Sequence, residues 1–404
     1  MMVRARAAGR ALTSRVALVD SDLHSLIADG SFELSGAGRG ALGAFVQPAS
    51  LDIPIGRRCL MLRDKALPFR RRVEALLVEE DMVLEERVVD AGGSFLLLKG
   101  QTYLFPCGRV SLAEHLEGSL SPKSSIGRVD LMVRGVFDHC GLYDTVRGSG
   151  ELWMEVSPRS FNVRVSSGQA LSQMMVFDDS CESCAAAPAR SPSPSPSPSP
   201  SPSPSPSRLL TPLEEPLDDL AFDAAGNALP LQMHRGALVL TLNLHPCASG
   251  LVGFEALATN AVVDLRSVGA HAKEDFFRPI VLGAERHSLT LEKDKFYVLS
   301  TKEKVRIPTH LSAEMVPFSQ HVGELRAHYA GFFDPGFGYG LAGEIKGTVG
   351  VLEVRPHETI TVCDGQPICM MEFFRNSKRP DIPYGSAGNN YQGQSGPKLA
   401  KYFK

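Results

Sequence analysis

The sequence predicts a mainly β protein built from two copies of one fold. Short stretches such as residues 51–56 and 161–165 alternate apolar and polar side chains, which is the pattern of half-buried strands. Glycines and prolines recur every ~8–12 residues, a spacing typical of the turns in a β-sandwich or barrel. Similar motifs also occur in the same order in the two halves of the chain, which indicates a duplicated unit.

Length and composition support two domains and narrow the range of partners. The chain has 404 residues, 43% of them hydrophobic, and a single core rarely grows beyond ~250–300 residues. Lysine and arginine number 42 against 45 acidic residues, so the chain lacks the basic excess of a general nucleic-acid binder. No apolar run approaches the ~18–20 residues that cross a bilayer. We therefore expect neither nucleic acid nor a membrane as a partner.

The eight cysteines are scattered along a long chain, so we expect free thiols and no disulfide framework. Residues 1–15 form an N-terminal extension, and the first nineteen residues hold four arginines and no acid. Such a segment is compatible with an organellar transit peptide and with an ordinary irregular N-terminus. The expected location is cytoplasmic, with a mitochondrion or plastid as the alternative if the extension is a targeting signal.

The sequence contains one clear helix candidate and one clear linker. Residues 20–30 begin with acidic and serine residues, continue with Leu23, Leu26 and Ile27, and end at a glycine, as a helix does. Residues 191–207 are pure Ser-Pro alternation, and proline at every second position removes backbone donors and fixes φ. This stretch predicts an extended spacer. We assign residues 16–184 to a first repeat, 185–208 to a linker and 209–404 to a second repeat.

The two repeats match each other motif by motif. Residues 100–105 match residues 294–299, and the Gly-Gln pair at 168–169 matches the pair at 365–366. Gly127 corresponds to Gly323, and Asp138 to Asp334. Residues 154–156 correspond to residues 352–354, so Glu155 and Glu353 are equivalent. The preserved order indicates one β fold present twice.

The densest polar cluster lies at residues 121–128, where Lys123, Ser124, Ser125 and Arg128 follow an apolar strand. Two hydroxyls, two cations and the backbone N–H groups of a turn can bind a polyphosphate, because its oxygens accept several hydrogen bonds. A solvated polar turn before a helix would have the same composition. The residues alone leave both interpretations open.

Glu155 is the second candidate, because it shares one face of a predicted strand with Trp153, the only tryptophan. A carboxylate beside an aromatic wall loses solvation, which suits a general base. An exposed strand glutamate with its stem on the indole is the alternative.

Several of these stretches together resemble the dCTP deaminases of the dUTPase superfamily. In the first half they are residues 47–56, 122–128, 151–159 and 167–169, with the opening helix. In the second half they are residues 313–318, 328–338, 351–357 and 390–399. The arrangement is similar to the long, double-domain bacterial deaminases, and it covers the chain except for the N-terminal extension and the Ser-Pro insert.

The resemblance implies two tandem dUTPase-like repeats, each a distorted β-barrel or jelly roll with a few short helices. It implies a homo-oligomer, usually with active sites between subunits. The reaction would be hydrolytic deamination of dCTP to dUTP and ammonia, with Mg²⁺ carried by the triphosphate, no zinc, and dTTP as a possible inhibitor.

Carried over motif by motif, Glu155 would be the general base. Ser124 and Arg128 would orient water and stabilise charge at the reacting centre. The implied substrate-binding residues are Lys123, Ser125, Gln169, Tyr391 and Gln394. Tyr391 and Gln394 lie in a tail that resembles the family segment that closes over bound nucleotide.

Zinc-dependent cytidine deaminases instead carry H-x-E followed by P-C-x-x-C. Here His115 and Glu117 precede Cys181 and Cys184, but Ser180 stands where the proline is needed. The cysteines then run into Ala-rich and Ser-Pro sequence rather than a helix. We therefore expect no zinc site.

The second repeat departs from the family pattern at the phosphate motif. Ser319, Gln320, His321 and Glu324 replace Lys123, Ser124, Ser125 and Arg128, so an acid stands where phosphate charge must be met. We expect a degenerate, structural repeat. Alternatively, it lends its tail or Glu353 to a site shared with the first repeat.

Two other functions stay open at this point. The first is a non-catalytic regulator that binds a deoxynucleotide. The second is a dUTP pyrophosphatase, or a bifunctional enzyme, for which Asp138 and Asp144 are available carboxylates.

Overall fold

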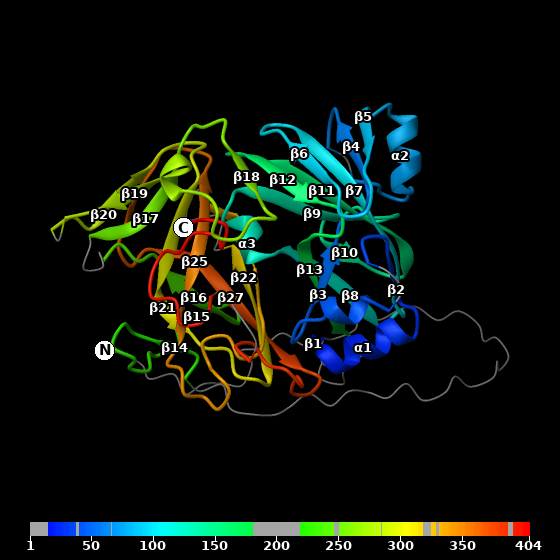
Figure 1. Cartoon of the computed structure of the whole chain (residues 1–404). Helices are drawn as coiled ribbons and strands as arrows, with labels where there is room; N and C mark the ends of the chain where they lie inside the picture. Colours follow the sequence, from blue (N-terminus) through cyan, green and yellow to red (C-terminus); the bar gives the residue numbers. More distant parts are fainter. Residues whose placement is uncertain are drawn as a thin grey trace, which may run out of the picture.

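The computed structural model describes residues 15–37, 40–65, 67–180, 219–245, 250–283, 285–317, 325–328, 331–386 and 391–404. In these residues the chain is mainly β with a few short helices, which confirms the predicted fold class (Figure 1). Closure of each repeat into a barrel stays a prediction. The Ser-Pro linker and residues 1–14 of the N-terminal extension lie outside the described residues.

The first repeat contains thirteen strands and four short helical segments among its described residues. They are β1 (Val16–Ala17), α1 (Asp20–Ala28), β2 (Phe32–Leu34), η1 (Leu42–Phe45), β3 (Leu51–Pro54), β4 (Arg58–Leu62), α2 (Val73–Glu79), β5 (Val83–Val88), β6 (Ser94–Leu97), β7 (Thr102–Ser111), β8 (Leu116–Pro122), α3 (Ser124–Gly127), β9 (Leu131–Phe137), β10 (Thr145–Val146), β11 (Ser149–Pro158), β12 (Asn162–Ser166) and β13 (Ala170–Asp178).

The second repeat is almost wholly β in the part that the structure describes. Its elements are β14 (Ala221–Phe222), β15 (Met233–His234), β16 (Ala237–Thr241), β17 (Leu251–Ala256), β18 (Val262–Asp264), η3 (Lys273–Asp275), β19 (Phe277–Val281), β20 (Ser288–Leu291), β21 (Tyr297–Val305), β22 (Leu311–Pro317), β23 (Leu325–His328), β24 (Phe332–Phe333), β25 (Thr348–Pro356), β26 (Ile360–Cys363) and β27 (Pro367–Asn376).

The elements that the sequence predicted most clearly are present. The helix expected at residues 20–30 is α1, and the Asp22 carboxylate accepts a hydrogen bond of 3.2 Å from the Val19 backbone at its start. The two alternating stretches form β3 and β12. Helix α2 was not anticipated, because its apolar residues lie in a charged segment that reads as a surface turn. None of the described helices has the length and apolar character that a bilayer crossing requires.

The duplication is visible in sheet topology. Each repeat has a six-stranded sheet with one side branch, in the order β5-β4-β7-β11-β9 for the first and β19-β17-β21-β25-β23 for the second. Glu155 lies on β11 and Glu353 on β25, the corresponding strands of the two sheets. The sequence match between the repeats is therefore a structural match as well.

One larger sheet joins the repeats. Strand β1 pairs with β13 of the first repeat and with β27 of the second, so Val16 lies between Asp178 and Arg375. Around this joint the rings of Phe177 and Phe374 meet with centroids 4.8 Å apart, inside a buried cluster that also holds Ala17 and Phe332. The two repeats therefore share backbone hydrogen bonds and an apolar seam.

The joint generates a stability prediction. Phe374→Ala should lower the free energy of unfolding by ~3–5 kcal/mol, because it leaves a cavity against Phe177 in a fully packed seam. Urea denaturation followed by circular dichroism measures the change. Leu142→Ala, at a side chain that is 64% exposed, is the control and should have little effect. Equal stability of Phe374→Ala and the wild type would contradict the packing role of the seam.

Candidate active site

A cavity of about 190 Å³ lies between the repeats, bounded by α3 from the first and by β25 and the C-terminal segment from the second. We call it the inter-repeat pocket. Its lining residues are Gln47, Lys123, Ser124, Ser125, Arg128, Gln173, Met315, Gly331, Phe332, Phe333, Asp334, Phe337, Val351, Glu353, Tyr384, Tyr391, Gln394 and Lys401.

The polar motif of the first repeat forms one wall of this pocket. Strand β8 ends at Pro122, which has no N–H to continue a ladder, and Lys123 remains extended before the single turn α3. Ile126 anchors that turn in the core with 1% exposure. The turn therefore presents Ser124, Ser125 and Arg128 to the pocket, together with Lys123. All four residues of the predicted motif line one cavity.

Arg128 connects the two repeats in the centre of the pocket. It is buried, and its Nη1 donates to Gln394 Oε1 at 3.3 Å and to the Lys398 carbonyl at 3.0 Å. Its guanidinium lies 3.9 Å from the centroid of the Tyr391 ring, a cation–π contact. Tyr391 and Gln394, which the sequence placed in a closing tail, thus lie at the predicted motif.

Glu353 faces Arg128 from the second repeat. Its Oε1 lies 3.6 Å from Arg128 Nε, and both side chains are buried. Burial raises the pKa of the Glu353 carboxyl to about 8, and the charge of Arg128 opposes the rise. The pocket thus holds a carboxyl that exchanges protons near neutral pH, next to a fixed positive charge.

Asp334 is a second carboxyl in the pocket, just after β24. Burial, with a smaller contribution from Asp52, raises its pKa to about 7, while Lys123 opposes the rise. Its Oδ1 has no hydrogen-bond partner among the described residues. The following turn passes so close to Tyr384 that a Cβ on Gly336, at φ +104°, would lie 2.6 Å from the Tyr384 carbonyl oxygen. Glycine at this position lets the Asp334 turn and Tyr384 share the wall.

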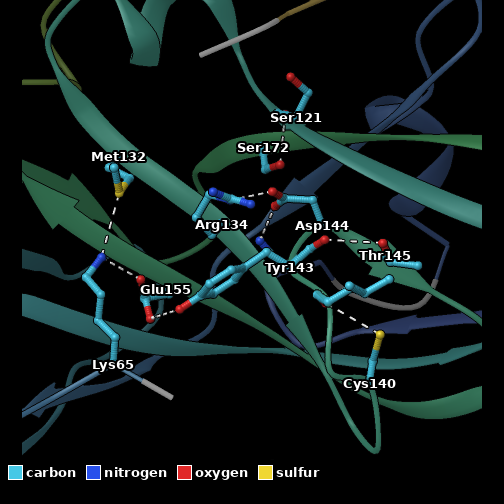
Figure 2. Close-up of polar contacts among 12 residues, drawn as sticks. Lys65, Ser121, Met132, Arg134, Cys140, Tyr143, Asp144, Thr145, Glu155 and Ser172 are labelled. Carbon is cyan, nitrogen blue, oxygen red and sulfur yellow. Dashed lines mark hydrogen bonds and ion pairs between the residues drawn. The ribbon is translucent and has the colours of Figure 1, made fainter. Parts of the chain in front are cut away.

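Glu155 lies elsewhere. Its Oε1 accepts a hydrogen bond from Lys65 Nζ at 2.7 Å, and its Oε2 accepts one from the Tyr143 hydroxyl at 3.1 Å (Figure 2). Its side chain is 3% exposed, and it is not among the pocket-lining residues. The expectation that Glu155 acts beside Ser124 and Arg128 in one site is not met within a single chain, because α3 faces β25 and not β11.

Gln169 also lies outside the pocket. Its Oε1 accepts from the Ser166 backbone N–H at 3.1 Å and its Nε2 donates to the Leu265 carbonyl at 3.0 Å. Gln366 makes the equivalent turn bond with the Cys363 N–H at 3.1 Å. The repeated Gly-Gln pair therefore stabilises a turn in each repeat, and substrate binding by Gln169 stays a prediction.

The other candidate carboxylates are engaged away from the pocket. Asp138 accepts from the backbone N–H groups of Val73 at 2.8 Å and Glu151 at 3.1 Å. Asp144 pairs with Arg134 and accepts from the Gly135 N–H at 2.6 Å (Figure 2).

The residues that partly match the motif of zinc-dependent deaminases include Glu117. Its carboxylate forms an ion pair with Arg15 at 2.5 Å and another with Arg147. Cys181 and Cys184 lie outside the described residues.

The sequence left two expectations for the second repeat: a degenerate structural copy, or a contribution of its tail or Glu353 to a shared site. The lining of the pocket is consistent with the second, because Asp334, Glu353 and the tail all belong to it. The substituted phosphate motif shows that the second repeat has lost its own cation cluster, but it does not indicate where Glu353 and the tail lie. The sequence did contain a signal for these residues, because Asp334 and Glu353 match Asp138 and Glu155 of the first repeat.

Both repeats match one family of known proteins. Family models of the 2'-deoxycytidine 5'-triphosphate deaminase (DCD) N-terminal and C-terminal domains match residues 17–180 and 221–403. A "dCTP deaminase, dUMP-forming" of Corynebacterium glutamicum (strain R) is 29% identical over 134 residues, covering 32% of this chain and 67% of that protein. A protein of the same description from Rhodococcus erythropolis is 30% identical over 135 residues, covering 32% of this chain and 68% of the relative.

Among solved structures, the 2'-deoxycytidine 5'-triphosphate deaminase from Agrobacterium tumefaciens is similar over nearly the whole chain. The TM-score is 0.72 at 28% identity, and the match covers 91% of this chain and 100% of that one.

The pocket geometry predicts how Glu353 titrates. Arg128→Met should raise the pKa of the Glu353 carboxyl above about 8, because the opposing positive charge is lost while burial remains. The ¹³C shift of the labelled carboxyl, followed by NMR against pH, measures the change. Arg134→Met, which alters the Glu155 side of the first repeat, is the matched control and should leave this titration in place. A lower pKa in Arg128→Met would show that another group controls Glu353.

Proposed function

Since the chain belongs to the 2'-deoxycytidine 5'-triphosphate deaminase family, we propose that the inter-repeat pocket deaminates dCTP by hydrolysis to dUTP and ammonia. The observation that carries the proposal is the meeting of two half-sites. Lys123, Ser124, Ser125 and Arg128 come from one repeat, and a buried glutamate comes from the other.

In this proposal Glu353, and not Glu155, is the general base. A carboxyl with a pKa of about 8 can both take and return a proton near neutral pH. Glu353 removes a proton from water, and the resulting hydroxide oxygen bonds to C4 of cytosine. The proton then passes to the amino nitrogen, the C4–N bond breaks, and ammonia leaves. The remaining hydroxyl proton moves to N3, which took up the electron pair of the C4–N3 double bond when hydroxide added, and the C4 carbonyl forms.

Arg128 and Ser124 support this chemistry from the first repeat. The guanidinium lies 3.6 Å from the Glu353 carboxylate and stays charged throughout, so it stabilises negative charge that develops at the reacting centre. In this proposal the Ser124 hydroxyl, on the same turn, orients the attacking water. Tyr391 and Gln394 hold Arg128 in position through the ring contact and the hydrogen bond.

A triphosphate is bound by cations and hydrogen-bond donors, and in this proposal Lys123 and Ser125 supply them. Mg²⁺ is proposed to enter with the nucleotide, because it is commonly bound by substrate phosphates and one or two carboxylates. The described residues contain no group of three or more His, Cys, Asp or Glu side chains that could hold a metal. Asp334, with an unpaired oxygen in the pocket, is the residue suited to share such an ion. Bound Mg²⁺ would neutralise phosphate charge, and no zinc is required by this proposal.

A dUMP-forming reaction is the second candidate, favoured because the Corynebacterium and Rhodococcus relatives are described as dUMP-forming dCTP deaminases. It would add hydrolysis at the α-phosphate, for which Asp334 is the available pocket carboxylate. A deoxynucleotide-binding regulator without catalysis would use the same pocket. Inhibition by dTTP and assembly into a homo-oligomer are further proposals that rest on family membership.

Product analysis decides among these functions. Purified protein incubated with dCTP and Mg²⁺ should release ammonia and dUTP in equal amounts, resolved by ion-exchange chromatography. A zinc-selective chelator should leave the rate unchanged. Appearance of dUMP and pyrophosphate would support the bifunctional reaction. Binding of dCTP without turnover would leave the regulator as the function.

The two equivalent glutamates provide a matched pair of variants. Glu353→Gln should lower kcat by ~10²-fold or more, because the amide keeps the shape but cannot carry the proton. Binding of dCTP, measured by calorimetry, should persist. Glu155→Gln, at the corresponding position of the first repeat, should retain most of the activity. The reverse pattern would return the role of base to Glu155, at a site completed by another chain.

A further inference from the structure

The last residues of the chain form a fixed part of the inter-repeat pocket. Beyond Gln394, Leu399, Ala400 and Tyr402 are buried in a core cluster that contains side chains of both repeats. Lys401 lies between these anchors, is half-buried, and lines the pocket. The segment therefore carries a lysine into the cavity between the two repeats.

The backbone around Lys401 is held on both sides. The Lys401 carbonyl accepts a hydrogen bond of 2.9 Å from the Gly269 N–H, and the Tyr402 carbonyl accepts one of 3.1 Å from the Ala270 N–H. The Phe403 ring packs against Phe277 with centroids 5.3 Å apart. Because these contacts fix the chain before and after it, Lys401 is a pre-positioned side chain.

One carboxylate, Asp52, lies near two lysines at this end of the pocket. Asp52 is ion-paired with Lys123, its side chain is 10% exposed, and its Oδ1 has no hydrogen-bond partner among the described residues. Lys401 interacts electrostatically with both: burial and the charge of Lys123 lower its pKa, and Asp52 opposes this. Asp334 also faces Asp52 and Lys123.

We propose that Lys401 is a further phosphate-binding residue, which contacts the triphosphate of the nucleotide together with Lys123. Ammonium groups donate charge-assisted hydrogen bonds to phosphate oxygens. In the ligand-free pocket Asp52 neutralises these groups, and a triphosphate, with more charge and more acceptor oxygens, takes its place. The inference rests on the proposed function insofar as the substrate is a triphosphate. It adds a residue from the extreme C-terminus, beyond the tail motif around Tyr391 and Gln394.

Binding of inorganic tripolyphosphate to the full chain tests this role without any catalysis. Lys401→Met keeps the aliphatic stem and removes the charge, and calorimetry should show about tenfold weaker binding, about 1.4 kcal/mol. Lys401→Arg should restore most of the affinity. Lys404→Met, at an exposed lysine three positions along the same tail, should bind as the wild type does. Unchanged affinity in Lys401→Met, or no binding by the wild type, would overturn the proposal.

A nucleotide series separates phosphate binding from a structural role. Lys401→Met should weaken dCTP binding about tenfold and leave dCMP binding unchanged, with KM for dCTP raised and kcat retained. Equal weakening for dCMP and dCTP, or a fall in kcat alone, would indicate a distorted pocket and contradict the role. If the wild type does not deaminate dCTP but Lys401→Met still loses tripolyphosphate affinity, the proposed function fails and the phosphate site stands.

Discussion

The two repeats meet through a pair of buried ion pairs of opposite polarity. Arg128 and Asp130 of the first repeat face Glu353 and Arg355 of the second, so each repeat offers one cation and one anion at positions two residues apart. Glu353 and Arg355 lie on the same face of β25, since side chains alternate along a strand. Arg355 also donates to Ser160 at 2.9 Å. A buried charge without its partner destabilises the folded state. A shift of one repeat against the other would leave several of these four charges unpaired. The pairing fixes the relative position of α3 and β25, and the pocket depends on that position.

Around this contact the two repeats have kept different polar residues. The first repeat keeps the hydroxyls and cations of the 123–128 turn, while the second has exchanged them for other residues. The second keeps a carboxyl that faces an arginine, whereas its counterpart in the first, Glu155, is bonded to Lys65 and Tyr143. A lysine and a phenol satisfy both oxygens of Glu155 locally. In the proposed function each repeat therefore supplies one half of the site.

The C-terminal segment contacts both repeats within one chain. Tyr391 and Gln394 contact Arg128 of the first repeat, and Gln394 Nε2 also donates to the Val349 carbonyl of the second at 2.8 Å. Further along, Leu399 and Tyr402 enter a core cluster that contains side chains of both repeats. Lys401 is carried into the pocket by these anchors, so a residue far from the polar motif in sequence becomes its neighbour. The parallel pairing of β1 with β27 is a second connection between the two repeats.

Period-two patterning and the matched motifs were sufficient to predict the β class, the duplication, helix α1 and the polar turn at residues 123–128, because these depend on local sequence. They could not decide which glutamate meets Arg128. Glu155 and Glu353 occupy equivalent strands, and only the packing of α3 against β25 distinguishes them. The sequence could not place Gln169 for a related reason: a turn-stabilising amide and a ligand-binding amide look the same until their hydrogen bonds are known. Lys401 had no motif at all. Its place follows from long-range burial of Leu399 and Tyr402, and sequence spacing does not encode which distant surfaces a tail will cover.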